Sequence, residues 1–208
     1  MANWSFNEYA VKAATENVLN FVNRGLENLG LGSKDNIKDA IESLWKDGNE
    51  VLMSTFRPIP GTIKKINAPN IKSERDDMYS ESELASESDE EVGLRSYDID
   101  DTNGTTTIYM WGQTPWHYPH LWLAYLKETF DLKVYVCSHE ERDVYNVYGE
   151  IDSLDFEFAE KYFLENGPDW DDYGDERVEE YYDAYFKCST NLQKELLSRF
   201  KDCVEGRG

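Results

Sequence analysis

The chain has few cysteines, few histidines and few basic residues for its 208 positions. Its three cysteines, Cys137, Cys188 and Cys203, are odd in number and far apart, which argues against a disulfide framework and against a zinc site built from cysteine pairs. We therefore expect a reducing, cytoplasmic location. The 21 lysines and arginines are outnumbered by 42 acidic residues, so the clustered positive charge that binds nucleic acid directly is missing.

Long apolar runs and common catalytic motifs are also absent. No stretch approaches the roughly 20 apolar residues of a membrane span, and the first residues have neither the basic start nor the apolar run of a secretion signal. The sequence contains no glycine-rich phosphate loop, no Gly-x-Ser-x-Gly elbow and no His-Glu-x-x-His motif. These absences predict a protein that is not an enzyme, needs no cofactor and does not bind membranes.

Negative charge is concentrated in two stretches of the chain. Residues 74–101 contain twelve acids and two bases, and residues 150–183 contain fourteen acids and two bases, so their net charges are −10 and −12 against −21 for the whole chain. Such acidic fields repel phosphate and attract basic protein surfaces or cations. Six Trp, fourteen Tyr and nine Phe supply enough apolar material for a folded body beneath this charge.

Apolar periodicity predicts a mixed order of strands and helices. Alternating or β-branched residues predict strands over 4–12, 50–56, 105–111, 131–137 and 144–151. Helical spacing predicts helices that begin near Thr15, Ser33, Pro119, Phe156 and Val178. The polar, acid-rich residues 67–104 are interpreted as a solvated insertion before the third strand. We expect a domain over residues 1–152 and a C-terminal helical extension, 153–208, packed on it.

Three sequence landmarks resemble those of a known family. They are Ala2-Asn3-Trp4 at the first strand, Phe56-Arg57-Pro58-Ile59-Pro60 after the second, and Trp111-Gly112-Gln113-Thr114-Pro115-Trp116 after the third. Over about residues 2–152 the series resembles the YubB-like proteins of plasmids and phages, although Ser5 replaces the usual Cys and His117 the usual Asp. The resemblance implies an α+β fold with a ferredoxin-like antiparallel sheet of four or five strands, helices on one face, and a mobile-element origin.

Carboxylates alternate with aromatic rings in the second acidic stretch. The residues suited to bind a partner are Asp169, Trp170, Asp171, Asp172, Tyr173, Asp175, Glu176, Glu179 and Glu180. Carboxylates steer a basic partner and aromatic rings anchor it. We predict an accessory or inhibitory protein of a phage or mobile element that binds a basic, nucleic-acid-handling protein, as a nucleic-acid mimic would. Ordinary solubility is the other explanation of the same charge.

A second hypothesis places a small-ligand or metal site in the loop that contains Trp111, Trp116, His117 and His120. The two Trp rings flank a turn, where they either stack a planar ligand or close the end of the core. The two histidines, together with Cys137 and His139, are the candidate ligands for a soft metal. Three histidines in a chain of this length are more often exposed or satisfied in the core, so no metal site is predicted.

Overall fold

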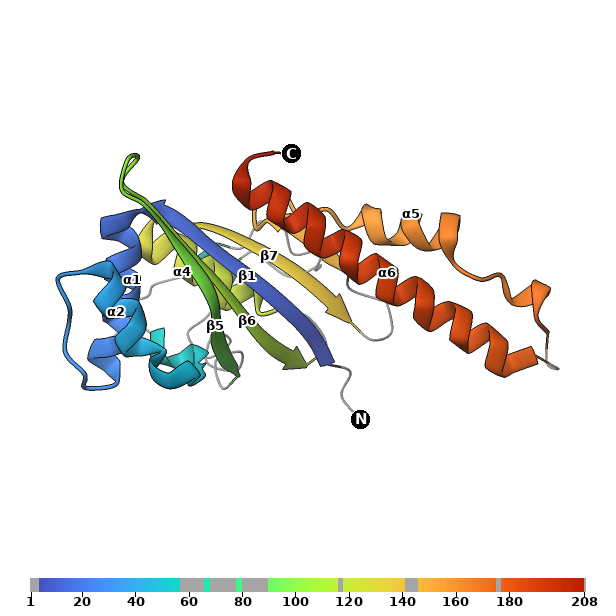
Figure 1. Cartoon of the computed structure of the whole chain (residues 1–208), viewed down its shortest axis with the longest axis horizontal. Coiled ribbons are helices and arrows are strands. Elements are labelled where there is room, and N and C mark those ends of the chain that lie inside the picture. Colours follow the sequence, from blue (N-terminus) through green and yellow to red (C-terminus); the bar gives the residue numbers. More distant parts are fainter. Residues whose placement is uncertain are drawn as a thin grey trace.

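Six antiparallel strands form the central sheet, in the order β2-β5-β6-β1-β7-β8 (Figure 1). They are β1 (Trp4–Ala14), β2 (Val51–Leu52), β5 (Glu91–Asp100), β6 (Thr105–Pro115), β7 (Lys133–Glu140) and β8 (Val147–Glu150). The computed structural model describes residues 4–56, 66–67, 78–79, 90–115, 118–140, 146–174 and 177–207. Within these ranges the chain is an α+β protein, as the sequence predicts.

Two helices cross from strand to strand over the same face of the sheet. Helix α1 (Thr15–Asn28) follows β1 directly, and α4 (His120–Phe130) connects β6 to β7. After α1 the chain returns to the sheet in β2 and then in β5. In each crossover one antiparallel strand separates the two long strands: β6 lies between β1 and β5, and β1 lies between β6 and β7.

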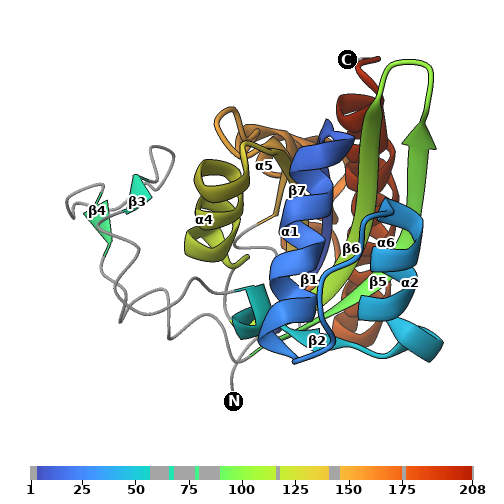
Figure 2. The same cartoon turned by 90° about the vertical axis from the view of Figure 1, so that its left-hand side faces the viewer.

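The two faces of the sheet carry separate apolar cores. On β1, Tyr9 and Val11 face α1, α2 (Ile37–Leu44) and α4, while Ala10 faces the long C-terminal helix α6 (Val178–Glu205). The same period-two alternation divides the side chains of β7 between the two cores. Figure 2 shows α4 and α6 on opposite sides of the strands. The molecule therefore has three layers, with the sheet in the middle.

Short elements complete the described chain. They are the 3-10 helices η1 (Lys46–Gly48), η2 (Met53–Phe56) and η3 (Trp170–Asp172), helix α5 (Glu157–Asn166), and the strand pair β3 (Ile66–Asn67) and β4 (Met78–Tyr79). Asn36 caps α2, since its Oδ1 accepts hydrogen bonds from the backbone nitrogens of Lys38 and Asp39 at 2.8 and 3.2 Å. Gly30 and Gly32 end α1 with φ values of 72° and 70°, which confirms the stop predicted there.

Two details of the predicted architecture are wrong. The sheet has six strands rather than four or five. Helices α1, α2 and α4 lie on one face as predicted, and α6 of the C-terminal extension covers the other. The strand predicted over 50–56 ends at Leu52 and continues as η2. The 3-10 turn buries both Met53 and Phe56, and it stacks the Phe56 ring on Phe21 with centroids 4.6 Å apart. Their three-residue spacing fits one face of a helical turn, whereas an alternating strand would point them to opposite sides.

The acidic insertion predicted over 67–104 does not extend to its predicted end. Residues 91–100 are the sheet strand β5, in which Val92, Leu94, Tyr97 and Ile99 all belong to the core under α1 and α2. Residues 68–77 and 80–89, which hold most of the acids of that stretch, lie outside the described residues. Most of the described part of the first acidic stretch is therefore a structural strand.

Candidate partner-binding arm

Helix α6 is longer than the sheet that it covers. Its buried residues begin at the eleventh of its 28 positions, and they are Cys188, Ser189, Leu192, Leu196, Phe200 and Val204. None of residues 178–187 is buried. Figure 1 shows this first part of α6 extending past the ends of the strands beside α5 and η3. We refer to residues 157–174, which include α5 and η3, together with residues 178–187 as the arm.

The arm is fixed to the sheet at the start of α5. Asp155 Oδ1 accepts hydrogen bonds from the backbone nitrogens of Glu157 (3.0 Å) and Phe158 (2.9 Å). Its Oδ2 accepts a hydrogen bond from the hydroxyl of Tyr148 on β8 (3.1 Å). Burial raises the pKa of Tyr148, so its hydroxyl stays a donor at neutral pH. Asp155 therefore ties the first turn of α5 to β8, the edge strand of the sheet, and this contact fixes the direction in which α5 leaves the sheet.

Aromatic contacts join the parts of the arm to one another. Phe163 of α5 stacks on Tyr185 of α6, with ring centroids 5.7 Å apart and planes at 25°. Trp170 of η3 meets the ring of Tyr181 edge-on at 4.9 Å, and Tyr173 contacts the same ring at 5.8 Å. Each such pair contributes about 0.5–1.5 kcal/mol beyond the area that it buries. The arm thus keeps a defined shape although it lies beyond the sheet.

Large apolar side chains are exposed on the arm. The exposed fraction is 82% for Leu164, 60% for Phe186, 51% for Tyr182 and 41% for Trp170. These four belong to a set of nine large hydrophobic side chains that are exposed in the described ranges. Single exposed apolar residues are common, but a group of them on one projection indicates an interaction surface.

Carboxylates lie beside these apolar side chains. Asp171, Asp172 and Glu179 are exposed, and their side chains form no ion pair with any other described residue. A carboxylate oxygen of Glu180 lies 3.7 Å from a guanidinium nitrogen of Arg177, in an exposed pair of little energetic value. Lys161 and Glu165 on α5 form a second exposed pair at 3.8 Å. Among the described residues, the carboxylates of Asp171, Asp172 and Glu179 are therefore available to a partner.

Seven of the nine residues predicted to bind a partner lie in the described part of the arm. Contact between η3 and the start of α6 gathers Asp169, Trp170, Asp171, Asp172, Tyr173, Glu179 and Glu180. Asp169 also has a structural role, since its Oδ1 accepts a hydrogen bond from the Asp171 nitrogen at 3.0 Å. Asp175 and Glu176 lie outside the described residues. Leu164 and Phe186 were not predicted as site residues, because apolar positions on a helix are usually buried.

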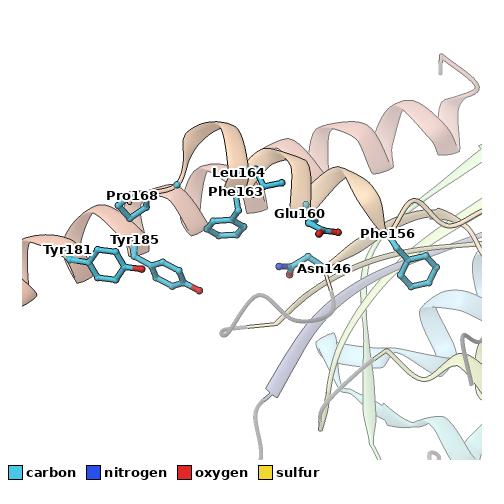
Figure 3. Close-up of a pocket in the computed structure, with 10 residues that line it drawn as sticks. Asn146, Phe156, Glu160, Phe163, Leu164, Pro168, Tyr181 and Tyr185 are labelled. Atoms are coloured by element: carbon cyan, nitrogen blue, oxygen red, sulfur yellow. The ribbon is translucent and has the colours of Figure 1, made fainter. Parts of the chain in front are cut away.

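A groove of about 520 Å³ runs between α5 and the start of α6 (Figure 3). The rings of Phe163, Tyr181 and Tyr185 form much of its wall, and Leu164 and Glu160 also line it. In Figure 3 the Tyr185 ring projects into the space beside Phe163. Glu160 is the one charged side chain among the described residues that line the groove. The groove is therefore aromatic and carries negative charge at its edge.

The residues of the alternative ligand loop do not converge in the described structure. Trp111 is paired with Glu8 on the α6 face of the sheet, whereas His120 begins α4 on the other face. Trp116 and His117 lie outside the described residues. Trp111 and His120 therefore cannot serve one ligand together, and the structure does not favour a small-ligand site built on this pair.

The candidate metal ligands are also separated. Cys137 and His139 lie on the α6 face of β7, on the other side of the sheet from His120. His139 Nε2 is 3.2 Å from the hydroxyl of Ser189 on α6. Burial raises the pKa of Cys137 to about 12, which keeps this thiol protonated and a poor metal ligand. Within the described ranges, no three His, Cys, Asp or Glu side chains are grouped to hold a metal ion.

Two further observations concern the chain as a whole. Among the described helices, none combines the length and the apolar character needed to cross a membrane. No family model matches the chain, and no curated protein or solved structure matches it either. Function is therefore inferred from the shape and chemistry of the arm.

Proposed function

We propose that this chain is a non-catalytic interaction protein that binds a basic protein through its arm. The observation that carries the proposal is the projection of α5, η3 and residues 178–187 beyond the sheet, where exposed carboxylates without an ion pair to any described residue lie beside exposed apolar side chains. Charge at a rim guides encounter with an oppositely charged partner, and aromatic side chains supply most of the binding energy once in contact. Solubility alone would need the carboxylates but not the exposed rings.

The partner that fits best is a protein whose own basic surface handles nucleic acid. A projection that presents carboxylates can occupy a cationic groove that normally holds phosphates. Direct nucleic-acid binding by this chain would require a cluster of lysines and arginines, and the net charge of −21 opposes it. We infer a role as an accessory or inhibitory protein, of the kind that an origin in a phage or other mobile element implies.

The central part of the fold is consistent with that origin. Strands β7, β1, β6 and β5 lie in that order, and α1 and α4 each cross over one intervening strand. This β-α-β-β-α-β connection is the one that defines ferredoxin-like domains. We infer that residues 4–140 contain a ferredoxin-like core, as the resemblance to YubB-like proteins implies, and that the arm is an addition to it which carries the binding function.

The proposal is tested with two variants of equal net charge. In the arm variant, the exposed acids Asp171, Asp172, Glu179 and Glu180 become Asn or Gln. The control variant makes the same number of Asp→Asn and Glu→Gln changes at exposed acids away from the arm. These are Glu16 on α1, Asp35 before α2, Asp39 on α2 and Glu128 on α4. Both variants and the wild type are immobilised and offered host lysate at low and high ionic strength.

We expect the wild type and the control variant to retain the same basic protein at low salt, with binding that salt weakens. The arm variant is expected to bind that protein at least about tenfold more weakly, because charged pairs at close range each contribute more than a kilocalorie. Equal loss in both variants would mean that net charge alone drives capture, and equal retention would mean that the arm takes no part. Either result overturns the proposal.

A further inference from the structure

We propose that the groove between α5 and α6 receives an arginine side chain of the basic partner. This inference rests on the proposed function and adds the chemistry of recognition to it. Four aromatic residues, Phe156, Phe163, Tyr181 and Tyr185, line the groove, and Glu160 lines it too. No basic side chain is among the described residues that line it. In its described lining the groove therefore combines aromatic rings with a negative charge, which together favour a cation.

The C-terminal region already binds guanidinium groups on aromatic rings twice. The Cζ atom of Arg199 lies 4.0 Å from the ring centroid of Phe158. Phe158 is on α5 and precedes Ala159, one of the residues that line the groove. The Cζ atom of Arg177 lies 5.3 Å from the ring centroid of Tyr173. Both distances are within the roughly 6 Å over which a cation is attracted to a ring face. An arginine from a partner would repeat on Tyr185 or Phe163 a contact that neighbouring residues make.

The geometry favours arginine over lysine. A guanidinium is planar, so its face can lie on an aromatic ring while its edge donates paired hydrogen bonds to a carboxylate, and the groove is lined by both kinds of group. An ammonium group is a compact and strongly hydrated charge that gains less from stacking. The volume of about 520 Å³ is within the range of sites that enclose small ligands, so an extended side chain and its neighbours can enter.

The test uses two short peptides as probes, acetylated pentaarginine amide and acetylated pentalysine amide. Binding of each to the full chain is measured by isothermal titration at low ionic strength. We expect pentaarginine to bind more tightly than pentalysine. Tyr185→Leu should weaken pentaarginine binding by roughly three- to thirtyfold, the equivalent of one cation–ring contact, and should leave pentalysine binding nearly unchanged. Tyr185→Phe, which keeps the ring, should preserve the preference for arginine.

A second pair of variants guards against a disturbed fold in Tyr185→Leu. Glu160 is exposed, and Glu160→Gln should weaken pentaarginine binding more than Asp39→Asn, which removes an equal charge from exposed α2 on the other face of the sheet. Equal affinity for both peptides, unaffected by the Tyr185 and Glu160 changes, would overturn the arginine site and leave the proposed function intact. Failure of both peptides to bind the wild type would overturn the site and the proposed function together.

Discussion

The guanidinium of Arg95 lies over the ring of Trp111, with its Cζ atom 5.0 Å from the ring centroid. The Arg95 Nη2 atom is 2.9 Å from a carboxylate oxygen of Glu8 on β1, on the other side of β6 from β5, and this ion pair holds the guanidinium in place. Beneath the indole is Gly93 of β5, where an added Cβ would lie 2.4 Å from the indole nitrogen. Trp111 is thus enclosed between a glycine and an arginine, which explains why it is not an open platform for a ligand.

Gly93→Ala should therefore destabilise the protein. The new methyl group would occupy the position of the Trp111 indole, which would have to move away from the strand and from Arg95. Forced overpacking of this kind typically costs about 1–3 kcal/mol. The free energy of unfolding, measured by urea denaturation and followed by tryptophan fluorescence, is expected to fall by that amount.

The Trp111→Ala background separates this contact from any other effect of the alanine. Without the indole, Gly93→Ala should be neutral or stabilising by about 0.5–1 kcal/mol, because alanine loses less backbone entropy than glycine on folding. The double-mutant cycle should then show a coupling above about 1 kcal/mol between the two positions. Equal costs in both backgrounds would show that the indole does not lie over Gly93.

The sequence predicted strand β6 but not its partner β5, and the irregular register of β5 explains the difference. Val92 and Leu94 alternate toward the core, but the register shifts at Arg95, and the next core-facing residues are Tyr97 and Ile99. A β-bulge adds one residue to a strand and reverses the parity of the side chains that follow. No single alternation therefore spans 91–100, and its acids make the segment look like a solvated loop. Strand β6 has no such shift, so its β-branched residues were recognised.

The arm shows a different limit of sequence prediction. The aromatic and acidic residues of η3 were identified as a binding surface, because their composition is unusual wherever they lie. The exposure of Tyr182 and Phe186 could not be predicted, since they continue the same helical stripe as the buried Leu192 and Leu196. Periodicity shows which side of a helix is apolar, but the length of the sheet decides where that side stops being covered.

Substitutions of two phenylalanines on α6 test where the packing of this helix on the sheet ends. Phe200 is 3% exposed against the sheet, whereas Phe186 is 60% exposed on the arm. Phe200→Ala should lower the free energy of unfolding by about 3–5 kcal/mol, the usual cost of emptying a core site. Phe186→Ala should cost about 1 kcal/mol at most, for the loss of its ring contacts with Tyr182 and Tyr185. Chemical denaturation of both variants makes the comparison, and similar costs would mean that the arm packs into the protein.

The buried hydroxyl of Ser138 supports a prediction that a substitution stabilises the protein, whereas the two phenylalanine substitutions should destabilise it. Ser138 of β7 is fully buried, and within the described residues its Oγ has no hydrogen-bond partner. Ser138→Ala removes this unpaired polar atom and should raise the free energy of unfolding by about 1 kcal/mol or more. Ser189→Ala is the matched control, because its hydroxyl pairs with His139 and its loss should destabilise by about 1 kcal/mol. If Ser138→Ala also destabilises the protein in thermal denaturation, its hydroxyl has a partner such as a bound water.

Cys137 gives the fold a specific sensitivity to alkaline pH. Burial raises the pKa of its thiol from 9.0 to about 12, so the folded protein keeps the proton over a range in which the unfolded chain releases it. Because the unfolded state binds fewer protons there, the stability that this thiol contributes is fully present below pH 9 and is lost as the pH rises toward 12. The slope for one such group approaches about 1.4 kcal/mol per pH unit. Buried tyrosines such as Tyr135, whose pKa burial also raises, add to the decline in the same direction.

Cys137→Ala isolates the contribution of the thiol. The variant should be less stable than the wild type at pH 8, because it loses packing in the core beneath α6. Above pH 9 its free energy of unfolding should fall less steeply, so the difference between the two proteins should shrink by up to about 1.4 kcal/mol for each pH unit. Urea denaturation at intervals from pH 8 upward measures both curves, and the tyrosines cancel in the comparison. Parallel curves across this range would show that the Cys137 thiol ionises in the folded protein as readily as in the unfolded chain, and that α6 does not seal this part of the sheet.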